Sequence, residues 1–138
     1  MSSGNKPHSF PIRVYYEDTD AGGIVYHANY LNFAERARTE ALRDAGIDQS
    51  VLWKTHGIGF VVRKATIDYS RPARLDDLLR VETHLEKWGR ASLTLVQTIR
   101  RDQETLAVVH VKLAVIDHEF GLVEVSEELK KLLSKIFH

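Results

Sequence analysis

The residues best suited to chemistry lie in one short acidic segment near the N-terminus. Glu17, Asp18 and Asp20 stand within four positions, Gly22–Gly23 follow them, and His27 comes next. A carboxylate and an imidazole beside the free backbone amides of a helix start can hydrolyse an acyl group. The carboxylate attacks the carbonyl or activates water, and the amides stabilise the oxyanion. The same composition is common in plain turns, so spacing alone leaves both interpretations open.

A helix is predicted directly after this turn, and it is the element that must position these groups. Steps of three and four separate the members of its apolar face, which are Tyr30, Phe33, Ala34, Ala37, Ala41 and Ala45. Small alanine side chains allow close approach, so this face is expected to pack tightly into a concave surface. The other face is charged, with Glu35 and Arg38 at pairing distance. Asn29 is the expected N-cap and Gly46 the expected residue after the C-cap.

Strand-like segments lie on both sides of this helix in the sequence. An apolar strand is expected over Ile12–Tyr16, and alternation or β-branched residues predict strands over Ile58–Tyr69, Leu79–Glu86, Ser92–Arg100 and Leu106–Ile116. One strand, a long helix and four strands in hairpin succession indicate an α+β fold. Ser126 is expected to start a C-terminal helix. A single helix covers one side of a sheet, so apolar strips on the other side predict oligomerisation.

Several motifs carry a resemblance to a known family. The segment Val14–Tyr30, which reads VYYEDTDAGGIVYHANY, closely resembles the signature of the 4-hydroxybenzoyl-CoA thioesterase family, above all its Tol–Pal system-associated acyl-CoA thioesterases. Further matching stretches are Glu35–Glu40, Phe60–Lys64 and Arg71–Asp77, so the resemblance covers roughly residues 10 to 117. The resemblance implies a hotdog fold, an antiparallel sheet wrapped around one long helix. It also implies dimers that pair into tetramers, with active sites at the dimer interface.

The resemblance also implies roles for individual residues. Asp20, the second aspartate of the Asp-x-Asp motif, is implied to be the nucleophile on the thioester carbonyl or the general base for water, and both roles stay open. Asp18 is then a structural turn residue. The backbone N–H of His27 is the implied oxyanion donor, and its imidazole is expected to orient water or polarise the carbonyl. Tyr26 is expected to line the acyl pocket, with a plain core aromatic as the alternative.

Coenzyme A carries phosphates on a long arm, so its site needs basic residues at a rim. The candidates are Arg63, Lys64, Arg71, Arg74 and Arg90, each of which could equally be a solvated surface charge. The chain contains no cysteine and no Gly-x-Ser-x-Gly, His-x-x-x-His or nucleotide-binding glycine motif. We therefore expect an enzyme that uses neither a metal nor a cofactor.

Composition sets the remaining expectations. The 138 residues carry a formal net charge of zero, which gives no basic bias toward nucleic acid or an anionic membrane. Residues 1–9 are expected to be a loose tail and residues 10–138 a single domain. No secretory signal is recognisable and no stretch approaches the ~20 apolar residues of a membrane span. The expected location is therefore the cytoplasm.

The sequence thus predicts a hotdog acyl-CoA thioesterase, which cleaves an acyl-CoA to a free acid and CoA. One alternative is a hotdog protein that acts on or binds acyl-carrier protein. A dehydratase belongs to the same group, although the Asp-x-x-Gly-Ile-Val-Tyr pattern argues against it. A second alternative is a partner-binding protein of the Tol–Pal envelope machinery or of lipid synthesis, with weak hydrolysis. Acyl chain length and the choice between dimer and tetramer are not predicted.

Overall fold

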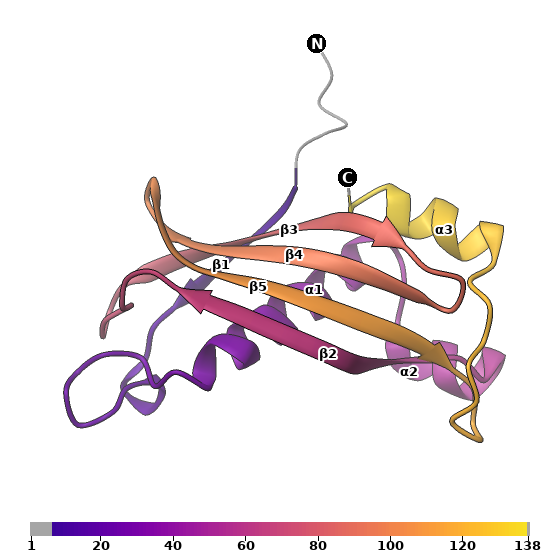
Figure 1. Cartoon of the computed structure of the whole chain (residues 1–138), viewed down its shortest axis with the longest axis horizontal. Helices are drawn as coiled ribbons and strands as arrows, with labels where there is room; N and C mark the ends of the chain where they lie inside the picture. The colour runs from indigo at the N-terminus through magenta and orange to yellow at the C-terminus, as the bar shows by residue number, and fades with distance from the viewer. Residues whose placement is uncertain (1–6, 138) are drawn as a thin grey trace, which may run out of the picture.

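A five-stranded antiparallel sheet with one long helix across a single face forms the body of the protein. The computed structural model describes residues 7–137. The sheet has the order β1-β3-β4-β5-β2, and Figure 1 shows helix α1 (Asn29–Asp44) behind it. The strands are β1 (His8–Arg13), β2 (Gly59–Tyr69), β3 (Leu78–Trp88), β4 (Ser92–Arg101) and β5 (Glu104–Ile116). The short elements are η2 (Tyr16–Asp18), α2 (Gln49–Val51), η3 (Leu52–His56) and α3 (Glu127–Ser134). This confirms the α+β class and the hotdog architecture.

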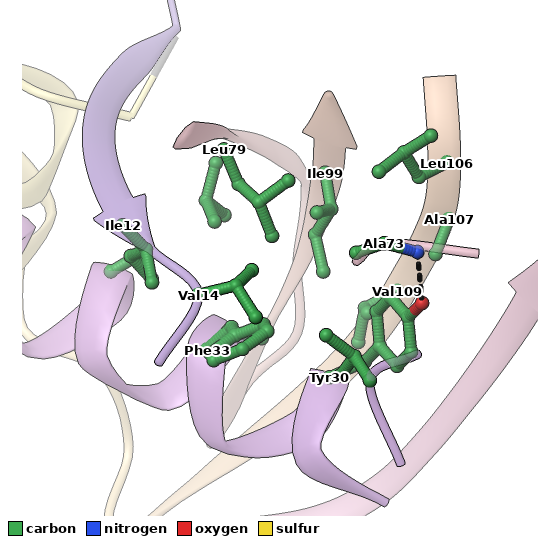
Figure 2. Packing of buried hydrophobic residues seen from close by; sticks show 14 residues of the cluster. Ile12, Val14, Tyr30, Phe33, Ala73, Leu79, Ile99, Leu106, Ala107 and Val109 are labelled. Atoms are coloured by element: carbon green, nitrogen blue, oxygen red, sulfur yellow. Dashed lines mark hydrogen bonds between the residues drawn. The ribbon is translucent and has the colours of Figure 1, made fainter. Parts of the chain in front are cut away.

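The apolar face of α1 packs on the inner face of the sheet. Its fully buried residues include Phe33, Ala34, Ala37 and Ala41, as the spacing predicts. Figure 2 shows Phe33 and Tyr30 facing core side chains of the sheet, among them Leu79, Ile99 and Val109. Burial of one side chain the size of Phe33 contributes roughly 1.5–3 kcal/mol. Alanines elsewhere on this face bring the helix backbone close to the strands.

The two ends of α1 are built differently. At the C-terminal end Gly46 has φ 84, its N–H donates to Arg43 O, and Ile47 N–H donates to Leu42 O. These two bonds form a Schellman motif, which confirms the role predicted for Gly46. At the other end the N-cap is Ala28, not Asn29, and no side chain caps the helix. The Asn29 prediction is wrong because its side chain instead donates to Asp18 Oδ1 over 2.7 Å.

Three further expectations need correction. Strand β1 ends at Arg13, so Tyr16 lies in the turn η2 and its side chain is 82% exposed. The predicted loose tail is too long, since His8 and Ser9 belong to β1; residues 1–6 lie outside the described range. Arg38 does not form an ion pair with Glu35 among the described residues.

Arg38 bonds instead to a buried amide on β4. Its Nη1 donates to Gln97 Oε1 at 3.0 Å, while Gln97 Nε2 donates to Ala34 O and Thr83 Oγ1. Gln97 is fully buried, so its amide needs these partners. Burial lowers the pKa of the Arg38 guanidinium, and the nearby charge of Glu35 opposes that shift. The network joins the middle of α1 to the sheet.

The face of the sheet opposite α1 is not covered by any helix of residues 7–137 (Figure 1). His110 and Lys112 lie on this outer face, as predicted. Strand β2 forms one edge of the sheet, and Val61, Val62 and Tyr69 along it are exposed hydrophobic side chains. Within the described range, no helix is long and apolar enough to span a membrane.

Candidate active site

The acidic segment forms a tight hairpin just before α1. Thr19 pairs with Val25, Asp20 N–H donates to Ile24 O at 2.9 Å, and Gly23 N–H donates to Asp20 O at 3.0 Å. Gly23 has φ 79, a left-handed conformation that glycine adopts without strain. The loop thus folds by its own turn chemistry and presents Asp20 at its tip.

The two aspartates of the motif have different surroundings. Asp18 is only 4% exposed, and its carboxylate accepts hydrogen bonds from Tyr15 N–H at 2.9 Å and from the Asn29 side chain. Asp20 is exposed, and its Oδ1 accepts from Gly22 N–H at 2.8 Å. Its Oδ2 has no hydrogen-bond partner within residues 7–137. Asp18 therefore holds the loop, whereas Asp20 offers a free carboxylate oxygen.

An open pocket of about 370 Å³ lies beside the hairpin and the start of α1. Its walls are Ile24, Val25, His27, Tyr30, Tyr69, Ser70, Arg71 and Pro72. We call it the His27 pocket. Asp20 is not in its wall, although its hydrogen-bonded neighbour Ile24 is. Tyr26 is also outside the wall: it is 51% exposed, and its ring packs on the His27 ring at a centroid distance of 4.4 Å.

Two backbone amides just before α1 are unpaired among the described residues, whereas the Asn29 N–H donates to Tyr26 O at 2.8 Å. No side chain caps the helix at Ala28, and neither the His27 nor the Ala28 backbone N–H donates to another described residue. The N-terminal end of a helix carries a positive partial charge and unpaired donors. An oxygen that gains negative charge during a reaction would be stabilised there.

Two tyrosines brace this helix start against the sheet. Tyr69 Oη, at the end of β2, donates to His27 O at 2.8 Å, and its ring meets the Tyr30 ring edge-on at 5.2 Å. Tyr30 Oη in turn accepts from Ala73 N–H at 3.0 Å, as Figure 2 shows. Burial, and then the neighbouring Tyr30, raise the pKa of Tyr69. Sequence reasoning missed Tyr69, whose one available signal was its place just before the Arg71–Asp77 motif.

The predicted basic residues do not gather at one place. Arg71 lies in the wall of the His27 pocket and pairs with Glu104 at 2.9 Å. Arg63 and Arg90 line a second open cavity, of about 520 Å³, together with Leu122 and Glu124. We call it the Arg63 cavity.

The other two basic candidates lie elsewhere. Lys64 is on the outer face with Lys112. Arg74 belongs to the turn after β2, where its N–H donates to the Asp77 side chain. The structure therefore divides the five candidates among three cavities and a turn. Residues 7–137 contain no cluster of side chains that could hold a metal ion.

Known proteins resemble this chain in sequence and in fold. A sequence model described as the Thioesterase-like superfamily matches residues 14–133. The acyl-CoA thioesterase YbgC of Haemophilus influenzae is 50% identical over 109 residues, which are 79% of this chain and 80% of the relative. YbgC of Helicobacter pylori is 41% identical over 87 residues, 63% and 62% of the two chains. The crystal structure of a probable thioesterase from Bartonella henselae superposes with a TM-score of 0.83 at 38% identity, covering 87% of this chain and 99% of that one.

Proposed function

Since the chain belongs to the thioesterase-like superfamily and is an acyl-CoA thioesterase, we propose that Asp20 and the amides at the start of α1 carry out the hydrolysis. The uncapped helix start at the His27 pocket is the observation that carries this proposal. A stable helix end normally satisfies its first amides with a side chain. Donors left free at a mostly apolar pocket are suited to a developing oxyanion.

The proposed reaction needs no group beyond these residues and water. In one route Asp20 takes a proton from water, hydroxide adds to the thioester carbonyl, and the amides stabilise the oxyanion. The C–S bond then breaks, the thiolate of CoA leaves and is protonated, and the free acid remains. In the other route Asp20 attacks the carbonyl itself, and water hydrolyses the resulting anhydride. Rapid quenching followed by intact-mass analysis separates the routes, because only the second leaves an acylated protein.

The acyl group is proposed to lie in the His27 pocket. Ile24, Tyr30 and Pro72 supply apolar contact, and the imidazole of His27, another wall residue, is proposed to orient water or polarise the carbonyl. Tyr26 supports the site indirectly, by packing on the His27 ring.

The CoA phosphates are proposed to bind Arg63 and Arg90. These two guanidinium groups share one cavity, which suits a phosphate, whereas Lys64 lines a separate cavity with Lys112. Arg63 and Tyr69 are six residues apart on β2, roughly 20 Å at the usual rise of ~3.3 Å per residue. The Arg63 cavity and the His27 pocket of one chain therefore lie toward opposite ends of this strand.

A second copy resolves this separation. The β2 edge is exposed and carries apolar side chains, so it can pair with the β2 edge of another copy. Antiparallel pairing about a two-fold axis brings the start of one β2 next to the end of the other. The Arg63 cavity of one copy then lies at the same end of the dimer as the His27 pocket of its mate. Sedimentation should give at least a dimer, and Arg63→Gln should raise KM with little change in kcat.

The test of the reaction is thiol release from a panel of short, long-chain and aromatic acyl-CoA esters. Asp20→Asn should lower turnover by at least about 100-fold, since a catalytic carboxylate contributes about 10² to 10⁴. Asn keeps the acceptor for Gly22 N–H, so the melting temperature should not change. Asp102→Asn is the matched control, because Asp102 is another exposed turn aspartate. Wild-type turnover in Asp20→Asn would overturn the assignment.

The alternatives from the sequence are separate arms of the same experiment. The same acyl groups are offered on acyl-carrier protein, and turnover is compared with that of the CoA esters. Faster hydrolysis of the carrier-protein thioesters would identify them as the substrate. Turnover near background on both, with stable capture of acyl-carrier protein or of a Tol–Pal component, would favour a binding role.

A further inference from the structure

One wall of the His27 pocket comes from the segment between β2 and β3. Ser70, Arg71 and Pro72 belong to this wall. The segment continues to Asp77, directly before β3 begins, and it contains no helix or strand. Ser70 N–H and Arg71 N–H donate to Leu106 O at 2.8 and 3.1 Å, which ties the start of the segment to β5. The position of the remainder depends on contacts with its neighbours.

Arg101, the last residue of β4, holds this segment through two carboxylates. Its Nη1 donates to Asp77 Oδ2 at 2.6 Å, and its Nη2 donates to Glu104 Oε1 at 2.7 Å. The same Nη1 lies 3.4 Å from Pro72 O, in the wall itself. A guanidinium is a rigid planar fork, so two bonds in different directions fix its orientation. The Arg101 side chain is only 25% exposed, so solvent screens these bonds less than those of a surface pair.

Glu104 joins Arg101 to Arg71. One oxygen of its carboxylate, Oε1, accepts from Arg101, and the other, Oε2, pairs with Arg71 Nε at 2.9 Å. Asp77 makes a second connection, because its Oδ2 accepts from Arg74 N–H at 2.8 Å as well as from Arg101. Arg101 is thus connected to both ends of the segment that supplies the wall.

We propose that Arg101 is a positioning residue for the reaction, because it fixes the wall of Ser70, Arg71 and Pro72 against which the acyl group lies. This inference rests on the proposed function, in which the His27 pocket holds the acyl group. Arg101 does not line that pocket and touches no reacting atom in the scheme. A fixed wall contacts the acyl group in the ground state and in the transition state alike, so its loss should change KM rather than kcat. Loss of the wall should also weaken discrimination between acyl groups of different size.

Two simpler roles for Arg101 make different predictions. A purely structural role would lower the melting temperature and leave KM unchanged. A general attraction between its positive charge and the anionic CoA would survive in Arg101→Lys, because lysine keeps the charge and loses only the planar fork.

Arg100 supplies a matched control. It precedes Arg101 on β4, and its guanidinium also forms two hydrogen bonds, to Glu82 Oε1 at 2.7 Å and to Thr105 Oγ1 at 2.8 Å. Neither partner belongs to the segment between β2 and β3. Arg100→Lys and Arg101→Lys should therefore lose similar stability, which thermal unfolding measures.

Thiol release across the acyl-CoA panel tests the role in the reaction. Arg101→Lys should raise KM about fivefold, within the range typical of residues that act on a site through others, with kcat close to that of wild type. The ratio of kcat/KM between the best and the poorest ester should move toward one. Arg100→Lys should match wild type in all three quantities. Wild-type KM and selectivity in Arg101→Lys, or the same changes in both variants, would overturn the positioning role.

Hydrogen exchange gives a readout that does not depend on turnover. The Ser70 and Arg71 amides, which bond to Leu106 O, should exchange faster in Arg101→Lys than in wild type and stay protected in Arg100→Lys. Unchanged exchange in Arg101→Lys would show that Arg101 does not hold the wall, and would overturn the inference while leaving the hydrolase intact. No turnover by wild type on any thioester would overturn the proposed function, and with it the part of Arg101 in the reaction, even where the exchange result stands.

Discussion

The two ends of helix α1 differ in how they treat their unpaired backbone groups. At the C-terminal end, Gly46 and Ile47 donate to the last carbonyls and close the helix with its own chain. At the N-terminal end, Ala28 brings no capping side chain, and the His27 and Ala28 amides have no acceptor within residues 7–137, although the Asn29 N–H donates to Tyr26 O. The closed end lies toward α2 and α3, and the open end follows the protruding acidic loop (Figure 1). One helix thus has an end that serves stability and an end that remains available to a ligand.

The open end is nevertheless held in place. Asp18 accepts from the side chain of Asn29, and Tyr69 donates to the carbonyl of His27. Neither contact uses an amide N–H of the first turn. The supporting groups therefore fix the position of the helix start without occupying the donors that the reaction needs.

The largest effect on stability is expected from Asp18→Ala. It leaves Tyr15 N–H and the Asn29 side chain without their buried acceptor, which should lower the free energy of unfolding by about 3 kcal/mol. Urea denaturation measures this loss. The paired control is Asp20→Asn, which should change stability by less than about 0.5 kcal/mol because its side chain is exposed. Equal losses in the two variants would contradict the distinction between Asp18, which holds the loop, and Asp20, which is exposed.

The sequence predicted the elements that local periodicity encodes. The alanine face of α1, the inward row of β5 from Ala107 to Val115 and the Ser126 cap of α3 all follow from spacing or capping chemistry. The contacts that hold the start of α1 were not predicted, because they join distant residues. Asn29 bonds to Asp18 eleven positions away, and Tyr69 to His27 forty-two positions away. No local pattern reports such pairs.

Which basic side chains lie together could not be predicted from the sequence, for a different reason. Strand β2 has a register shift between Val62 and Lys64, so strict alternation does not hold through Arg63. A bulge of this kind changes which side chains share a face. Lys64 consequently lines one cavity with Lys112, while Arg63 lines a separate cavity with Arg90 from the turn after β3. The chemical part of the candidate site, Asp20 and His27, stays a prediction from the motif.

An intermediate effect is expected at the closed end. Gly46→Ala places a side chain at φ 84, where a left-handed conformation costs roughly 1–2 kcal/mol. No atom lies within 4 Å of the added Cβ, so the loss comes from backbone strain alone. Thermal unfolding should show it, while kcat stays at the wild-type value. A fall in kcat would mean that the two ends of α1 are coupled.

The smallest effect is a pH dependence just beyond the closed end. Asp48 caps the short helix α2, and hydrogen bonds from the Ser50 side chain and from the Val51 and Ser50 backbone lower the pKa of its carboxyl. A lowered pKa means that this stabilisation is complete above the ordinary aspartate pKa and is lost as the pH falls through the folded value.

The melting temperature of Asp48→Ala should therefore lie below that of wild type at pH 7, and the gap should shrink below about pH 4. Glu119→Ala is the control, since the side chain of Glu119 is exposed and contacts no charged partner among residues 7–137. Turnover of Asp48→Ala at pH 7 should equal that of wild type, because α2 is distant from the His27 pocket. A constant gap at all pH values would show that the cap does not depend on an ionised carboxylate. A loss of turnover would show that the closed end also serves the reaction, and the division between the two ends of α1 would no longer hold.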